Sequence, residues 1–233
     1  MANIVNVNSV ASLGKKVHKG SLLIRFIFSG IVVVAGFLLG LYGASALVTE
    51  YGEYTISIAD KDKQSSSISL CDTLDFLNPT VNLKCPGVES MTNISGKSLP
   101  AGIDDTDGSH NGESYVAYTF YLKNNSQSQI TINEAMKIDS VLLGADQAIR
   151  VRVYRDGIYT TYAKVSQNGT PEYGTIAFDG DYVFNDIVTM PSQKINKYTI
   201  VIWLEGDDPE CLDNIKGGAV NLSMAFSIVE ATT

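Results

Sequence analysis

The hydrophobic pattern of the chain consists of one long apolar run followed by short alternating segments. Residues 26–48 read FIFSGIVVVAGFLLGLYGASALV and contain no charged side chain. At a rise of about 1.5 Å per residue, a helix of this length crosses the roughly 30 Å of hydrocarbon in a bilayer. We therefore predict a single membrane-inserting helix over 26–48, serving as a transmembrane anchor or a signal segment.

Charged residues on the two sides of this run indicate its orientation. Four cations precede it and two acids follow it: Lys15, Lys16, Lys19 and Arg25, then Glu50 and Glu53. Because positive charge is retained on the cytoplasmic side, residues 1–25 are predicted to form a basic cytoplasmic tail. The remainder of the chain is predicted to lie outside the membrane, at the cell surface.

The end of the apolar run leaves two fates open. Ala44-Ser45-Ala46 has the small-x-small pattern of a signal-peptidase site, so cleavage near Ala46 would release a secreted protein. The length of the run and of the preceding tail favours a retained anchor. Gly36, Gly40 and Ala44 share one helix face and could pack against a second helix, although such triplets also arise by chance in glycine-rich membrane helices.

Beyond residue 50 the pattern changes to the two-residue period of β-strands. Tyr54, Ile56 and Ile58 alternate with hydroxyl-bearing residues, as in a half-buried strand. Further strands are predicted at 67–71, 81–85, 114–123, 129–137, 149–154, 158–165, 198–204 and 221–228. Asp156-Gly157 is a strong hairpin signal, whereas 86–112 is rich in glycine and polar residues and is predicted to be irregular.

Short strands, frequent turn signals and the lack of a long amphipathic helix indicate an all-β fold. We predict an antiparallel β-sandwich over residues 51–233, with jelly-roll-like connectivity. The strand pattern contains no internal repeat.

The charge composition of the chain limits the classes of molecule that it can bind. The formal net charge is −8, with 25 acidic residues against 17 Lys and Arg. Nucleic acid requires a basic footprint, so we expect no nucleic-acid partner.

Three cysteines lie in the predicted outer part of the chain: Cys71, Cys85 and Cys211. Outside the membrane a disulfide is chemically accessible, and Cys71 with Cys85 would close a short loop. The alternative is that all three cysteines are reduced.

The sequence offers no recognisable catalytic arrangement. His18 lies in the tail, so His110 is the single histidine of the predicted outer domain, and neither an HExxH zinc motif nor a GxSxG elbow occurs. We therefore expect a protein that is not an enzyme and carries no obligatory cofactor.

Two acidic loops are candidate calcium sites, because alternating carboxylates beside a glycine can wrap a hard cation. The first loop offers Asp104, Asp105, Asp107, Asn111 and Glu113, but it does not fit the EF-hand pattern. The second offers Asp207 and Asp208 directly after a predicted core strand. The alternative for each loop is a solvated turn.

Aromatic residues could supply a glycan-binding face. Tyr154, Tyr159 and Tyr162 surround the Asp156-Gly157 hairpin. Tyrosines on a sheet are also common for packing alone.

Three phrases carry a resemblance to a known group. DGSHNGESYVAYTFYLKN (107–124), YTIVIWLEGDDPEC (198–211) and the entry YGEYTISI are similar to uncharacterised exported surface proteins of anaerobic Gram-positive bacteria. The layout resembles, more loosely, TasA/camelysin-type jelly-roll matrix proteins. That resemblance implies a fibre subunit in which an early strand, here Tyr51, Tyr54, Ile56 and Ile58, completes the sheet of the next copy. The protease label of the camelysins is not matched, because the histidines that a zinc protease needs are missing.

Two functional hypotheses follow. The first is an exported structural protein that self-associates into fibres or a matrix by donor-strand pairing. The second is a membrane-anchored extracellular module that binds a glycan or peptide.

Overall fold

The computed structural model describes residues 53–59, 67–88 and 90–229. The chain divides into two units, Met1–Thr49 and Glu50–Thr233, and every described residue belongs to the second. The predicted tail and the 26–48 helix, with Gly36, Gly40, Ala44 and the cleavage position, lie outside the described residues, as does Tyr51. Among the residues that are described, no helix is long and apolar enough to cross a membrane.

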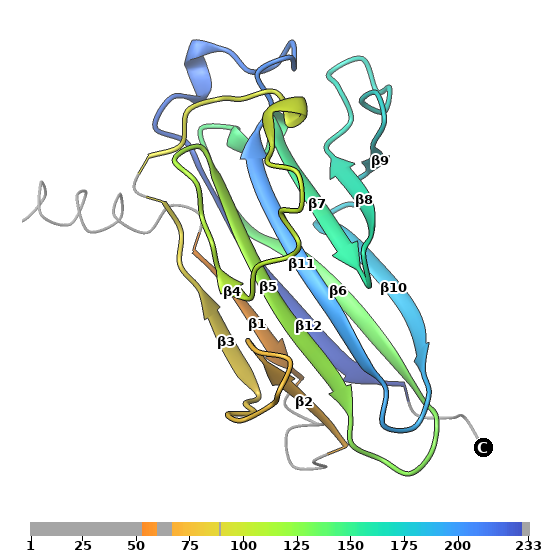
Figure 1. Cartoon of the computed structure of the whole chain (residues 1–233). Helices are drawn as coiled ribbons and strands as arrows, with labels where there is room; N and C mark the ends of the chain where they lie inside the picture. Colours follow the sequence, from red (N-terminus) through yellow and green to blue (C-terminus); the bar gives the residue numbers. More distant parts are fainter. Residues whose placement is uncertain (1–52, 60–66, 89, 230–233) are drawn as a thin grey trace, which may run out of the picture. The chain divides into compact units, whose positions relative to one another are not determined.

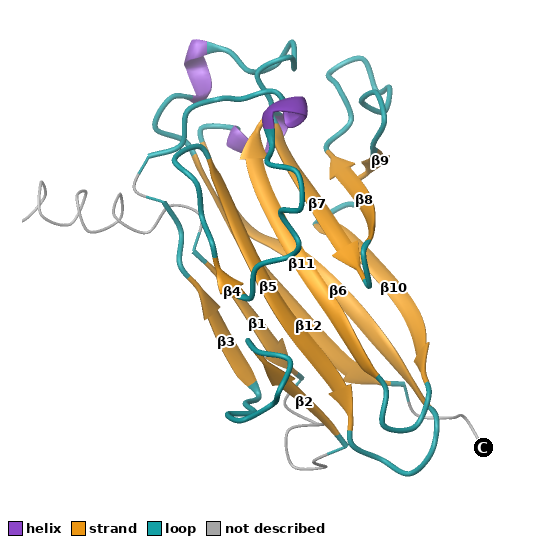
Figure 2. Ribbon diagram, in the orientation of Figure 1, coloured by secondary structure: helices purple, strands orange, loops and turns teal. Residues whose placement is uncertain are grey.

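The described part of the chain forms two β-sheets packed as a sandwich (Figures 1 and 2). The five-stranded sheet has the order β10 (Tyr182–Met190), β6 (Ile130–Leu142), β12 (Ala219–Ile228), β1 (Tyr54–Ile58), β3 (Asn82–Cys85). The seven-stranded sheet has the order β2 (Ile68–Cys71), β5 (Tyr115–Asn124), β11 (Ile195–Leu204), β7 (Ile149–Arg155), β8 (Ile158–Ala163), β9 (Ile176–Ala177), with β4 (Gly108–Ser109) also paired to β5. Short 3-10 helices occur at η1 (Gly96–Ser98), η2 (Ala145–Gln147) and η3 (Asp213–Ile215). The all-β sandwich expected from the alternating pattern is confirmed.

The two strands that are apolar on both faces lie at the centre of the seven-stranded sheet. β5 and β11 pair antiparallel along nearly their whole length, from Ile195 opposite Lys123 to Trp203 opposite Tyr115. Their inward side chains enter the intersheet core, and their outward side chains are covered by another segment. Apolar side chains on both faces therefore have a place to be buried, as expected for a central strand.

Aromatic rings fill the middle of the intersheet core. Phe120 of β5 stacks on Tyr198 of β11 with ring centroids 5.2 Å apart, and Phe226 of β12 meets Tyr198 edge-on at 5.4 Å. All three side chains are fully buried. These contacts join the two sheets, since Phe226 belongs to the five-stranded sheet and its two partners to the other.

Most connections cross from one sheet to the other. β5, β6 and β7 alternate between sheets, and β10, β11 and β12 do the same. Pairing is mainly antiparallel, but β1 runs parallel to β12 and β8 runs parallel to β9. The predicted antiparallel sandwich therefore also contains two parallel strand pairs. β1 is free to run parallel to β12 because the strand that follows it, β2, lies in the other sheet, so no hairpin fixes its direction.

The segment 86–112 covers part of the outer face of the seven-stranded sheet. Ile103 packs with Ala117, Val201 and Trp203 in a second, small apolar cluster. His110 helps to hold the segment, with Nδ1 2.9 Å from the Gly108 carbonyl oxygen and Nε2 2.8 Å from that of Ile103. The predicted irregular stretch is confirmed, apart from η1 and the two-residue β4.

Candidate functional site

The strand β1 is an interior strand of the five-stranded sheet although it opens the described domain. It pairs with β12 from Tyr54 opposite Leu222 to Ile58 opposite Phe226, and with β3 from Tyr54 opposite Cys85 to Ser57 opposite Asn82. Both long sides of β1 are thus hydrogen-bonded to neighbouring strands. We refer to the position between β12 and β3 as the β1 slot.

Side chains of β1 contribute directly to the intersheet core. Tyr54, Ile56 and Ile58 are each exposed by 1% or less, while Thr55 faces outward and is exposed. Transfer of three such side chains from water stabilises the fold by about 1.5–3 kcal/mol each. An empty slot would leave Leu83, Met224 and Phe226 without this cover, so the sheet requires a strand at this position.

A buried polar network joins the two sheets on the side of the sandwich where β10 lies. Glu134 of β6 is fully buried; its Oε1 lies 2.6 Å from Nε of Arg155, and its Oε2 accepts a hydrogen bond from the Tyr198 hydroxyl at 2.6 Å. Arg155 also contacts Asp186 of β10 at 2.7 Å. Burial raises the pKa of Glu134, while Arg155 and the Tyr198 hydroxyl act in the opposite direction. The network is well suited to fixing the two sheets relative to one another.

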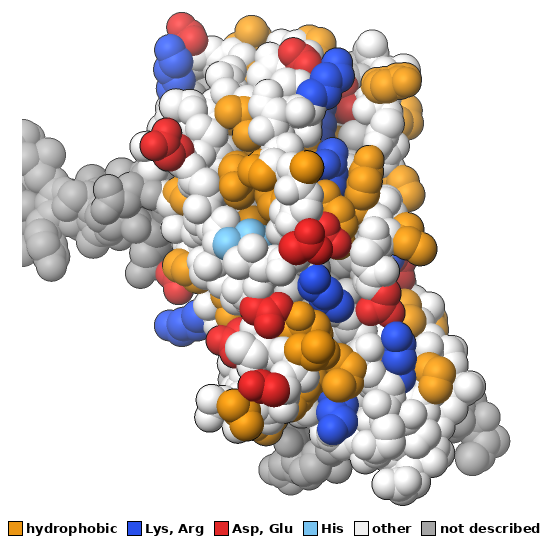
Figure 3. Space-filling model, viewed as in Figure 1, with side chains coloured by type: hydrophobic (Ala, Val, Ile, Leu, Met, Phe, Trp, Pro, Cys, Tyr) orange, Lys and Arg blue, Asp and Glu red, His pale blue; other side chains and the backbone are white. Residues whose placement is uncertain are grey.

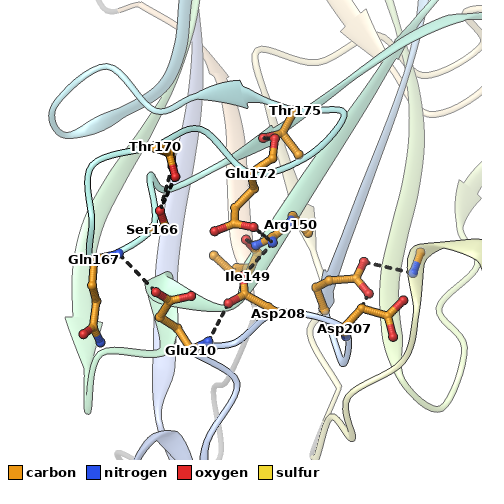
Figure 4. A network of polar contacts seen from close by, with 12 residues as sticks. Ile149, Arg150, Ser166, Gln167, Thr170, Glu172, Thr175, Asp207, Asp208 and Glu210 are labelled. Carbon is orange, nitrogen blue, oxygen red and sulfur yellow. Dashed lines mark hydrogen bonds and ion pairs between the residues drawn. The ribbon is translucent and has the colours of Figure 1, made fainter.

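A second polar network lies at the end of the seven-stranded sheet (Figure 4). Arg150 of β7 contacts Asp208 at 2.5 Å and Glu172 at 3.5 Å, and the Asp208 side chain is fully buried. Glu210 donates its backbone N–H to Asp208 at 2.7 Å and accepts one from the Gln167 backbone at 3.1 Å. Burial raises the pKa of Asp208 and of Glu172, whereas the hydrogen bond from Gln167 lowers that of Glu210.

Glu172, Asp208 and Glu210 are the group of carboxylates best placed to hold a cation within the described residues. One oxygen of each lies within 4.8 Å of the others. However, the guanidinium of Arg150 already supplies positive charge to Asp208 and Glu172. The arrangement is therefore an ion-pair cluster that anchors the loops 166–175 and 205–210 to β7.

The residues of the first acidic loop do not converge on one point. Asp107 accepts a hydrogen bond from the Tyr121 hydroxyl at 2.6 Å. Asn111 donates to the carbonyls of Pro86 and Gly87 and accepts from the Ala117 backbone. Asp105 and Glu113 are exposed, and Asp104 is half-buried. These side chains mainly hold the covering segment 86–112 in place.

The second acidic loop separates its two predicted ligands. Asp207 accepts a hydrogen bond from Ser95 Oγ at 2.9 Å, whereas Asp208 is directed to Arg150. Its neighbour Glu205 accepts from the Trp203 indole and from the Gly96 backbone, both at 3.0 Å. The loop is thus tied to its surroundings by hydrogen bonds from two directions.

The candidate bridge between Cys71 and Cys85 is not formed in the structure, and the alternative of three reduced cysteines is the one observed. All three cysteines are free, with Cys71 and Cys85 fully buried and Cys211 partly exposed. Cys71 ends β2 in one sheet and Cys85 ends β3 in the other. The Cys71 thiol lies 3.5 Å from the Thr73 hydroxyl, and Cys85 faces Tyr54 across β1 and β3.

The three candidate glycan-binding tyrosines fall on different faces. Tyr162 points into the core and stacks on Phe184 at 5.4 Å. Tyr154 and Tyr159 lie on the outer face of the seven-stranded sheet, with ring centroids 5.3 Å apart, and Tyr159 is 55% exposed. Only these two remain available as an aromatic surface.

Comparison with protein-family models, curated proteins and solved structures finds no match to this chain.

Proposed function

We propose that the chain is an exported structural subunit that self-assembles, with β1 of one copy filling the β1 slot of the next. Export rests on the charge-free run 26–48 and on the cations that precede it. Assembly rests on one observation: the first strand of the domain is inserted between β12 and β3 and completes the core. The connections that cross between the sheets, together with β6 lying between β10 and β12, support a jelly-roll-like sandwich as the accepting body.

The same contacts form whether β1 comes from its own chain or from a neighbour. Backbone hydrogen bonds to β12 and β3, and pockets for alternate side chains, depend only on the strand and its register. Exchange of β1 between copies therefore loses few contacts. If each copy donates its β1 to the next copy, the result is an open filament.

The linker between β1 and β2 is short. It therefore limits how far apart two copies can lie when β1 of one copy fills the slot of the other. Residues 59–67 connect Ile58 to Ile68 across the sandwich. Nine extended residues reach at most about 30 Å. In an exchanged assembly, neighbouring bodies must therefore lie close together, and subunit spacing along a fibre would be regular.

A disulfide that locks β1 into its own slot tests the proposal. Thr55 and Ser223 are partners in the parallel register of β1 and β12, where the typical strand spacing of about 4.8 Å suits a disulfide. We expect full-length monomer with Thr55→Cys and Ser223→Cys, oxidised before assembly, to remain monomeric and to form fibres after reduction, as seen by electron microscopy. The Ser223→Cys variant alone is the matched control. Fibres of equal abundance from the oxidised double variant would refute strand exchange.

A membrane-anchored binding module is the second candidate function. The observation that favours it is the partly exposed aromatic surface on the outer face of β7 and β8, formed by Tyr154 and Tyr159. A ligand for this surface is inferred in the next section.

A further inference from the structure

The outer face of β7 and β8 combines aromatic rings with the guanidinium of Arg152. Arg152 of β7 lies over the ring of Tyr159 at 4.5 Å and over that of Trp203 at 5.1 Å. Tyr154 lies beside Tyr159 on the same face. Figure 3 shows hydrophobic side chains with basic ones among them over this part of the sheet.

Arg152 differs from the other two arginines that the structure describes. Arg150 is paired with Asp208 and Glu172, and Arg155 with Glu134 and Asp186. Arg152 donates from Nε to the Thr161 hydroxyl at 3.0 Å. Within the described part of the chain, its Nη1 and Nη2 make no ion pair or hydrogen bond.

Stacking leaves those nitrogen donors available. A guanidinium interacts with an aromatic ring through its flat face, while its N–H groups point outward in the plane of the group. Two such N–H groups match the two oxygens of a carboxylate. Tyr159 and Trp203 therefore orient Arg152 without using the atoms that would bind an anion.

We propose that this surface, made of Arg152, Tyr154 and Tyr159 over the buried Trp203, binds a sugar that carries a carboxylate, such as a uronic acid. Arg152 takes the carboxylate through Nη1 and Nη2, and the exposed Tyr159 contacts the apolar face of the sugar ring. The site is separate from the β1 slot, because β7 and β8 belong to the other sheet. It does not depend on strand exchange.

The charge of the protein favours this ligand over a more highly charged one. The chain has a net charge of −8, and the surface offers one unpaired guanidinium. A polyphosphate or nucleic acid would meet long-range repulsion with too few cations to offset it. A single carboxylate on a ring needs one bidentate cation and an aromatic contact, which are the groups present here.

Titration of the full-length protein in detergent with trigalacturonate, followed by calorimetry, tests the site. Trp203 is the single tryptophan of the chain, so its fluorescence gives a second, local readout. The fully methyl-esterified trisaccharide keeps the rings and removes the charge. We expect it to bind at least about tenfold more weakly, because hydrogen bonds to a charged group contribute about 1.5–3 kcal/mol.

Substitutions test whether the proposed residues cause the preference for trigalacturonate over its methyl ester. Arg152→Gln is expected to abolish the preference for the acid over the ester, and Arg152→Lys to retain part of it. Tyr159→Ser, at an exposed position, is expected to weaken both ligands. Lys137→Gln removes the same charge from an exposed position on the other sheet and should bind like wild type. Equal binding of acid and ester, wild-type binding by Arg152→Gln, or binding of an acidic peptide with no response to trigalacturonate at millimolar concentration would overturn the proposal.

Discussion

Tyr54 and Cys85 face each other across β1 and β3, and both side chains are buried. The Tyr54 hydroxyl has no hydrogen-bond partner among the described residues. Burial raises the pKa of Tyr54 well above its ordinary value. The strand that completes the core therefore carries one unsatisfied polar atom into it, and a buried hydroxyl without a partner costs free energy.

This difference between Tyr54 and the well-bonded Tyr198 leads to the first prediction. We expect Tyr54→Phe to be neutral or to raise the free energy of unfolding by about 1 kcal/mol, since it removes the unsatisfied hydroxyl. Tyr198→Phe is expected to lower it by about 1.5–3 kcal/mol, because Glu134 loses a donor. Urea unfolding of both variants compares them directly, and similar losses for the two would contradict the assignment.

Buried carboxylates should make stability depend on pH. The folded-state pKa of Glu134 is raised, as are those of Glu172 and Asp208, whereas that of Glu210 is lowered. A raised pKa means that the folded state binds the proton more tightly than the unfolded state. Such a carboxyl stabilises the folded state in full below its unfolded-state pKa. This stabilisation is lost as pH rises through the folded-state pKa.

We therefore expect the free energy of unfolding to fall as pH rises above about 4.5, the ordinary pKa of a glutamate carboxyl, and through the raised folded-state pKa of Glu134. Glu134→Gln should make this dependence shallower, because the fully buried carboxyl no longer titrates. Glu113→Gln, at an exposed loop position, is the control and should keep the wild-type slope. A steeper dependence of the unfolding free energy on pH for Glu134→Gln would show that the predicted sign of the Glu134 contribution is wrong.

The free cysteines give a prediction about thiol reactivity. With native protein, we expect a thiol reagent to modify Cys211 rapidly and to leave Cys71 and Cys85 unmodified, because both are fully buried. All three should react in denaturant without prior reduction. If two of the three thiols react in denaturant only after a reductant is added, the protein contains a disulfide.

The cluster around Arg150 gives a prediction about stability. Arg150→Met leaves Asp208 buried without its cation, and we expect a loss of about 3–5 kcal/mol in thermal or urea unfolding. Adding Asp208→Leu to this variant should recover part of the loss, since the isolated carboxylate is then removed as well. If the double variant instead loses more stability than Arg150→Met alone, with the two losses adding, the result would contradict an ion pair between Arg150 and Asp208.

Local pattern was sufficient to predict most strands, but it missed β10. Tyr182–Met190 buries Val183, Phe184 and Met190, yet the strand shifts register between Tyr182 and Phe184, so the two-residue period is broken. Conversely, β6 was predicted too short, because its last four residues are exposed and lack an apolar side.

The polar sites were harder to foresee, because they depend on residues far apart in the sequence. Glu134 did have a signal, since it shares the inward positions of β6 with Ile132 and Met136, where a charge requires a partner. Asp208 was noted as an acidic-loop residue, but its contact with Arg150 arises only when a loop folds over β7. Sequence spacing alone cannot reveal that contact.

Cross-linking between two single-cysteine variants tests strand exchange most directly. Full-length chains carrying Thr55→Cys are mixed with chains carrying Ser223→Cys, both on a Cys211→Ser background, and are oxidised after assembly. We predict a covalent dimer that forms only in the mixture and requires both variants, since the proposed exchange brings Thr55 of one copy to Ser223 of the next, the register that the two residues have within one chain. Assembled protein that yields no mixed dimer, or the same dimers from either variant alone, would contradict the proposal that β1 passes between copies.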